Sequence, residues 1–147
     1  PKFDAIFLIN GFEYLSDPKQ AIELSKFMLR KNGLIYIRII PWTSRYGMID
    51  VRKFNKAYSH LFLSRQELSS MGVKTPLKPI YDVLEYVDMM IDSEFLVRHS
   101  RVYRQDVEKI FTTSMMMQKM SESCGIELSE DLLSITHIEY VLERRRS

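Results

Sequence analysis

The stretch FDAIFLINGFEYLSDP, residues 3–18, decides the fold that the sequence predicts. It begins with an uninterrupted apolar run made of Ala5, Ile6, Phe7, Leu8 and Ile9. Short runs of this kind are typical of strands buried on both faces, which belong to parallel sheets with helices on each side. The pair Asn10 and Gly11 ends the run. We therefore expect a buried strand of a parallel sheet within the first ten residues.

A helix and a second strand follow this first strand. Asp17 suits the N-cap of a helix and Pro18 its first position, so a helix is predicted from there to about residue 30. Its expected buried face consists of Ala21, Leu24, Phe27 and Met28. Residues 34–40 form a second apolar run, which Pro41 stops. Strand, helix and strand within about 40 residues predict a right-handed βαβ unit.

The remaining elements are predicted from shorter signals. Ser64 and Glu67 form an S-x-x-E capping box that starts a helix. Further helices are expected over residues 48–58, 81–91 and 105–123, and strands over 126–128 and 135–142. The chain is thus predicted to be an α/β protein.

Size, charge and cysteine content exclude several classes of protein. A chain of 147 residues has the length of one domain, so residues 1–147 are expected to form a single domain. The net charge of +2 gives no reason to expect a nucleic-acid or membrane partner. Cys124 is the only cysteine, which excludes a disulfide framework and a cysteine metal cluster, and we expect no metal site. No signal peptide and no apolar run of membrane-spanning length is visible, so a cytoplasmic location is expected.

Several segments, in this order, resemble the second half of a class I S-adenosylmethionine-dependent methyltransferase. Residues 3–41 resemble the part of that family from the fourth strand to the end of the fifth, with LRKNG where LKPGG is usual. SHLFLSRQEL, residues 59–68, is similar to a segment of the subgroup that methylates small metabolites, lipids and sugars. MMMQKMSESCGIEL resembles the helix that leads into the sixth strand, and ITHIEYVLERR the seventh strand. The resemblance implies a partial Rossmann-like sheet of strands 4, 5, 6 and 7 with flanking helices, and residues 75–104 as a helical insertion.

The resemblance also implies roles for individual residues. Asn10, Gly11 and Phe12 follow the fourth strand, where the family places residues beside S-adenosylmethionine. Pro41, Trp42 and Tyr46 follow the fifth strand, where the methyl acceptor is bound, and an ordinary packing role is the alternative. His60 matches a histidine of the subgroup and is a candidate base, although such a histidine more often fills structure.

The family's Gly-rich cofactor turn, D/E-x-G-x-G-x-G, is missing from the sequence. The only glycines are Gly11, Gly33, Gly47, Gly72 and Gly125, and no two are close enough to build it. The chain also begins with Pro1 rather than Met. We expect a piece of a longer enzyme, a segment of a multidomain protein, or a degenerate relative that works by binding. By itself it is expected to be inactive and not to bind the cofactor.

Two other functions stay open: a non-catalytic methyltransferase-like interaction module, and a nucleotide-sugar-binding Rossmann-like domain. The resemblance makes one further prediction. In the family the fourth strand is central and pairs with a first strand that this chain does not contain. The strand of residues 5–9 would then be a bare apolar edge, so self-association or another chain segment is expected to cover it.

Overall fold

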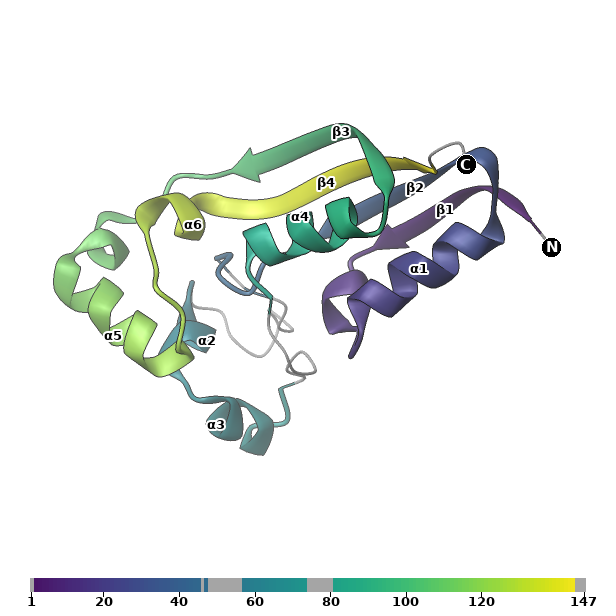
Figure 1. Cartoon of the computed structure of the whole chain (residues 1–147). Helices are drawn as coiled ribbons and strands as arrows, with labels where there is room; N and C mark the ends of the chain where they lie inside the picture. Colours follow the sequence, from purple (N-terminus) through teal and green to yellow (C-terminus); the bar gives the residue numbers. More distant parts are fainter. Residues whose placement is uncertain (1, 46, 48–56, 74–80, 145–147) are drawn as a thin grey trace. The chain divides into compact units, whose positions relative to one another are not determined.

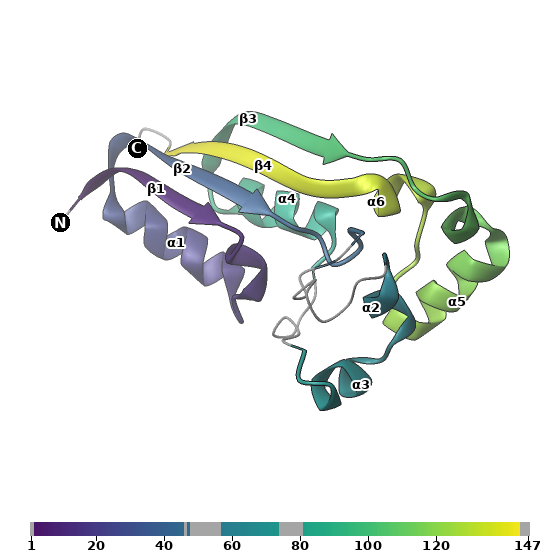
Figure 2. The same cartoon turned by 180° about the vertical axis from the view of Figure 1, so that it is seen from behind.

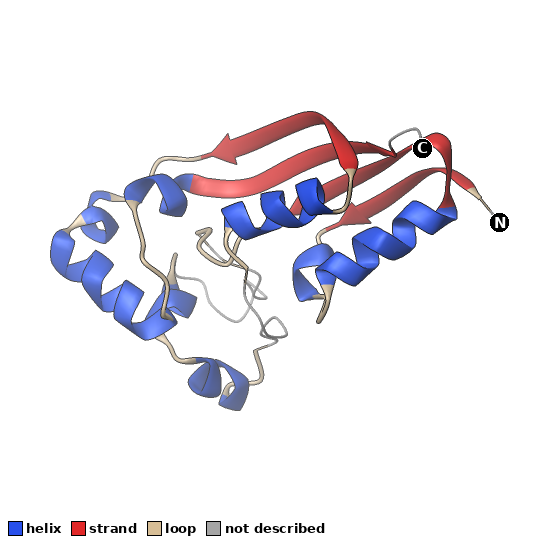
Figure 3. Cartoon of the chain, in the orientation of Figure 1, coloured by secondary structure: helices blue, strands red, loops and turns tan. Residues whose placement is uncertain are grey.

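The computed structural model describes residues 2–45, 47, 57–73 and 81–144, and over these residues it is a mixed α/β structure (Figure 3). Its strands are β1 (Phe3–Ile9), β2 (Leu29–Ile39), β3 (Phe95–Arg104) and β4 (Ile135–Arg144). Its α-helices are α1 (Pro18–Met28), α2 (Ser59–Phe62), α3 (Arg65–Ser70), α4 (Val83–Asp92), α5 (Ser114–Cys124) and α6 (Glu130–Ser134). Two 3₁₀ turns, η1 (Phe12–Tyr14) and η2 (Lys109–Thr112), complete the described elements.

The strands form one sheet in the order β1-β2-β4-β3 (Figure 1). β1 and β2 are parallel and joined by α1, which confirms the predicted βαβ unit. β4 runs antiparallel to β2, with Ile39 opposite Ile138. The carboxyl ends of β1 and β2 therefore lie at the same edge of the sheet, where ligands bind in open α/β folds.

Local signals start the helices where the sequence predicts. The Asp17 side chain accepts a hydrogen bond of 2.8 Å from the Gln20 N–H at the start of α1. At α3, Ser64 and Glu67 form the predicted capping box. The final predicted strand is confirmed as β4 and the helix predicted over residues 81–91 as α4.

The first compact unit of the chain comprises Pro1–Ile39, Pro76–Val102 and Ile138–Ser147. In it, α1 and α4 lie against the same face of the sheet, as two opposite views show (Figures 1 and 2). Side chains alternate between the two faces of β2, and one face lies against the core. Four residues of that face are fully buried, namely Leu29, Ile35, Ile37 and Ile39. Burying four such side chains contributes roughly 6–12 kcal/mol to folding.

The predicted buried face of α1 is wrong. Leu24, Phe27 and Met28 are exposed, and the buried residues of the helix are Pro18, Ile22 and Ser25. At 100° per residue these three lie in one stripe with Leu29, the first residue of β2. The apolar residues of α1 thus occupy two sides of the helix, and only one of them lies against the sheet.

The predicted sixth strand is also misplaced. Residues 126–129 form no strand, and the fourth member of the sheet is β3, inside the segment predicted to be a helical insertion. Within the predicted insertion, α4 is a helix as predicted, but residues 95–104 form a strand instead of a helix. Residues 75–80 lie outside the described residues. Between α4 and β3 the backbone turns at Glu94, which adopts a left-handed φ of 60°. Glycine is the usual residue in that conformation, so the turn is not recognisable in the sequence.

Two other predicted helices span residues 105–123 and 48–58. The helix expected over 105–123 begins only at Ser114, because residues 109–112 form the 3₁₀ turn η2. Gly125 ends α5 with a left-handed φ of 72°. Most of the helix expected over 48–58 lies outside the described residues, and residues 57 and 58 form a turn.

A second compact unit comprises Ile40–Thr75 and Tyr103–His137. The division falls inside β3 and β4, and the prediction of one domain over residues 1–147 stays a prediction. Among the described helices, none has the length and apolar character needed to cross a membrane.

Candidate functional site

The turn predicted to contact the cofactor follows β1 directly, in the first unit. Asn10 adopts a left-handed φ of 51°, and its N–H donates to the carbonyl oxygen of Arg38 on β2 at 3.1 Å. Gly11 is exposed, and a Cβ added to it would meet only the Ile9 carbonyl at 3.9 Å. The backbone of this turn is thus accessible at the carboxyl edge of the sheet, where a ligand could approach it closely.

Phe12 differs from its two neighbours because its side chain belongs to the core. It is only 1% exposed, and its ring centroid lies 5.7 Å from that of Tyr86 on α4. Burial, and then the adjacent carboxylate of Glu13, raise the pKa of the Tyr86 hydroxyl above its ordinary value. Phe12 therefore anchors the turn with its ring, and any contact with a ligand would come through its backbone.

The residues predicted to line the acceptor site follow β2 and belong to the second unit. Pro41 and Trp42 are both buried, and Tyr46 lies outside the described residues. Trp42 contacts the candidate base His60 in an edge-to-face arrangement, with ring centroids 4.9 Å apart. The structure thus brings together two of the predicted residues, 18 positions apart in the chain.

His60 is fully buried, with 0% exposure. Its Nε2 lies 2.6 Å from the carbonyl oxygen of Trp42. Because a carbonyl only accepts hydrogen bonds, Nε2 carries the proton and Nδ1 does not. Nδ1 is buried too and has no hydrogen-bond partner among the described residues. Burial lowers the pKa of the His60 imidazole to about 4, although the bond to Trp42 opposes this.

This environment defines what His60 does in the described structure. A general base must reach the proton that it removes, and the nitrogen that could accept a proton, Nδ1, is buried in the described structure. The imidazole fixes the loop after β2 by holding the Trp42 carbonyl. A catalytic role for His60 stays a prediction.

Sequence reasoning missed Tyr58 as a structural member of this unit. Its side chain is 1% exposed, and its hydroxyl donates to the carbonyl oxygen of Leu133 in α6 at 2.9 Å. The centroid of its ring lies 4.9 Å from the centroid of the Phe111 ring. Tyr58 thus ties the residues before α2 to two segments more than fifty positions away. No local sequence signal marks such a long-range bond.

Replacing Tyr58 by Phe should lower the free energy of unfolding by about 1–3 kcal/mol, because the buried Leu133 carbonyl loses its donor. Chemical denaturation measures this loss. The half-buried Tyr81 provides a control, and Tyr81→Phe should change stability by less than about 0.5 kcal/mol. Equal effects of the two substitutions would contradict the role assigned to the Tyr58 hydroxyl.

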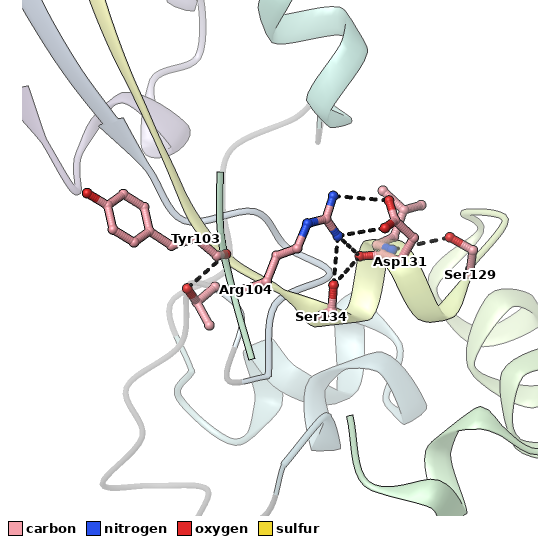
Figure 4. Close-up of polar contacts among 7 residues, drawn as sticks. Tyr103, Arg104, Ser129, Asp131 and Ser134 are labelled. Carbon is pink, nitrogen blue, oxygen red and sulfur yellow. Dashed lines mark hydrogen bonds and ion pairs between the residues drawn. The ribbon is translucent and has the colours of Figure 1, made fainter. Parts of the chain in front are cut away.

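The second unit also contains a polar pocket of about 700 Å³, lined by residues of β3, the segment after it, and α6. Arg104 lies in this lining. Its guanidinium donates hydrogen bonds to both carboxylate oxygens of Asp131, at 2.7 and 3.2 Å, and to the Ser134 hydroxyl at 2.8 Å (Figure 4). The charges of Arg104 and Asp131 are thus paired with each other, and this ion pair connects β3 to α6. Among the described residues, no group of three His, Cys, Asp or Glu side chains could hold a metal ion.

The chain matches no protein-family model and no curated protein sequence. Its fold, however, matches solved structures along almost its whole length. One is an S-adenosylmethionine-dependent methyltransferase from Mesorhizobium loti, with TM-score 0.54 and 12% identity, covering 98% of this chain and 64% of that one. Another, from Thermotoga maritima, has TM-score 0.52 and 15% identity and covers 97% of this chain and 56% of that one.

A methyltransferase of the same kind from Methanosarcina mazei has TM-score 0.50 and 13% identity, covering 99% of this chain and 61% of that one. The chain therefore spans 56–64% of the length of these three proteins. At such low identity the similarity shows the fold alone. Over its described residues, the chain has a mixed α/β fold with an open four-stranded sheet, the Rossmann-like type found in class I S-adenosylmethionine-dependent methyltransferases.

Proposed function

We propose that this chain is the C-terminal part of an S-adenosylmethionine-dependent methyltransferase that acts on a small-molecule, lipid or sugar acceptor. The observation that carries the proposal is the match of nearly the whole chain to solved methyltransferases of which it spans only part. The sequence supports it through the ordered segments that resemble the second half of such enzymes.

In this proposal the turn after β1 supplies one side of the cofactor site. Asn10 and Gly11 would contact the cofactor through their backbone, because that backbone is exposed at the carboxyl edge of the parallel strands. The ring of Phe12 holds the turn in position from the core. A Gly-rich turn, absent from this sequence, would supply the other side from a part of the protein outside this chain.

The acceptor side is assigned to the loop after β2, with Pro41, Trp42 and Tyr46. Methyl transfer by in-line displacement depends mainly on the positioning of donor and acceptor. His60 would contribute by holding the Trp42 carbonyl and hence the loop. The single cysteine fits a cytoplasmic protein, and burial raises the pKa of the Cys124 thiol, which disfavours its nucleophilic thiolate form.

Gly11 offers a test of the cofactor assignment. Gly11 has a φ of −145° and open space at its Cβ position, so Gly11→Leu should leave the fold intact. The added side chain would stand where the cofactor approaches. We expect the longer protein that contains this chain to bind S-adenosylhomocysteine at least about tenfold more weakly with this substitution.

Ser16→Leu is the matched control, because Ser16 is exposed in the same connection but near the start of α1. Isothermal titration calorimetry measures both variants, and the control should bind like the unmodified protein. Equal affinity of the Gly11→Leu variant would place the cofactor elsewhere.

A further inference from the structure

The dipeptide Asn–Gly occurs twice in the chain, at residues 10–11 and at residues 32–33. We propose that the first pair is a site of spontaneous covalent modification, in which Asn10 is converted to aspartate and isoaspartate, and that the fold protects the second pair. The reaction needs only this chain and water, so it does not depend on the proposed function. Because the two pairs have the same sequence, a difference between their rates in the folded protein comes from the structure around them.

The conversion begins with an attack of the backbone on a side chain. The Gly11 amide nitrogen loses its proton to solvent and bonds to Cγ of Asn10, the bond from Cγ to the side-chain nitrogen breaks, and ammonia leaves. Water then opens the resulting succinimide ring at either of its carbonyl carbons, giving aspartate or isoaspartate. One water is consumed and one ammonia released, and nothing is oxidised or reduced. Glycine favours the attack because it has no Cβ to shield its nitrogen or to restrict its rotation.

Both reacting groups of the first pair are accessible. Asn10 and Gly11 are exposed in the turn between β1 and η1. Neither the Asn10 side-chain amide nor the Gly11 N–H makes a hydrogen bond within the described part of the chain. The bond from the Asn10 N–H to the Arg38 carbonyl belongs to the preceding peptide, so it need not break. With open space around Gly11, the peptide that joins the two residues can rotate until its nitrogen faces Cγ.

The second pair is held inside β2. Asn32 is exposed, but Gly33 is buried, and both belong to the strand Leu29–Ile39. A Cβ added to Gly33 would stand 2.9 Å from the Arg30 carbonyl oxygen and 2.9 Å from Cδ2 of Leu29, so the backbone is tightly packed there. Rotation of the peptide between Asn32 and Gly33 therefore requires the strand to open locally first. The fold should slow ring closure at this pair.

Conversion of Asn10 changes the turn after β1 in two ways. Both products carry a carboxylate in place of a neutral amide, and isoaspartate lengthens the backbone of residue 10 by one carbon atom. The Asn10 N–H is bonded to β2 and the Phe12 ring is anchored in the core, so the extra carbon must displace Gly11 between them. A weakening of cofactor binding would follow, and this consequence alone rests on the proposed function.

Peptide mapping by mass spectrometry tests the site in protein incubated without ligand. Deamidation raises the mass of a peptide by about one dalton, and electron-based fragmentation distinguishes isoaspartate from aspartate. We expect Asn10 to react at least about tenfold faster than Asn32, in the folded 147-residue chain and in the longer protein. In urea, where the fold is absent, the two rates should become similar. Equal rates in the folded longer protein would overturn the inference, and so would a tenfold difference that persists in urea.

Gly11→Ala tests the chemistry even in a chain that does not fold. Gly11 has a φ of −145° and open space at its Cβ position, so the added methyl group fits while it shields the attacking nitrogen. Conversion of Asn10 should slow at least about tenfold, and the rate at Asn32 is the internal control that should not change. An unchanged rate at Asn10 would contradict the inference. Absence of S-adenosylhomocysteine binding would reject the proposed function and leave these rates as they are.

Discussion

Acidification from pH 6.5 to pH 4 should remove about 3 kcal/mol from the free energy of unfolding through His60 alone. The folded state holds the pKa of this imidazole at about 4, below its ordinary value of 6.5. The unfolded chain therefore takes up a proton at pH values where the folded chain does not. The contribution is fully present above pH 6.5 and is lost as the pH falls toward 4.

The physical cause lies in the two ring nitrogens. Nε2 already carries a proton for the Trp42 carbonyl, so a second proton must go to Nδ1, which is buried and has no partner among the described residues. A buried charge without a partner is costly. Urea denaturation at a series of pH values measures the effect.

His60→Gln removes the titrating group and serves as the comparison. The variant should be less stable at pH 7, and the difference between the two proteins should shrink as the pH falls from 6.5 to 4. A constant difference over this range would show that His60 is not a buried neutral histidine.

Gly47→Ala should destabilise the protein by about 3 kcal/mol. The added Cβ would stand 2.5 Å from Nε2 and 2.6 Å from Cδ2 of His60. The imidazole is fully buried and bonded to Trp42, so it has little room to move. Overpacking costs about 1–3 kcal/mol, and the left-handed φ of 57° at Gly47 adds about 1–2 kcal/mol for a residue with a Cβ.

Gly125→Ala separates the two causes. Gly125 has a similar φ of 72°, but nothing lies within 4 Å of its Cβ position. It should therefore show only the backbone cost of about 1–2 kcal/mol. Thermal or chemical denaturation of both variants gives the comparison, and an equal loss in the two would mean that His60 does not crowd Gly47.

The βαβ unit was predictable because its signals are local. An apolar run, an Asp–Pro helix start and a second apolar run each act over a few residues, and they suffice to predict that β1, α1 and β2 form. The predicted burial of β1 is wrong, because its residues are exposed or half-buried at the edge of the described sheet. The sixth strand was not predictable in the same way. β3 carries Arg98, His99 and Arg101, nearly all of its residues are exposed, and the turn before it uses Glu94 where glycine is usual.

The side of α1 that packs against the sheet could not be predicted either, for a different reason. Its exposed side, with Leu24 and Phe27, is as apolar as its buried side, and a hydrophobic pattern alone does not say which of two apolar sides meets the sheet. In the observed orientation Lys19 and Lys26 form ion pairs with Asp92 and Glu94 around the end of α4, contacts between positions about 70 residues apart that no local pattern shows.

Part of the candidate site was predictable as a set of residues but not as an arrangement. Trp42 and His60 were both candidates, yet their contact depends on how the loop after β2 folds back. The sequence also could not distinguish the exposed Gly11 from the buried ring of Phe12 next to it. Burial is a property of the assembled core and not of the local pattern.

In the proposed function, this chain contributes one part of a cofactor site and another part of the protein completes it. Calorimetric titration of S-adenosylhomocysteine into the 147-residue chain and into the longer protein tests this proposal. We expect saturable binding by the longer protein and no measurable heat with the 147-residue chain. Micromolar binding by the short chain, or no binding by the longer protein, would contradict it.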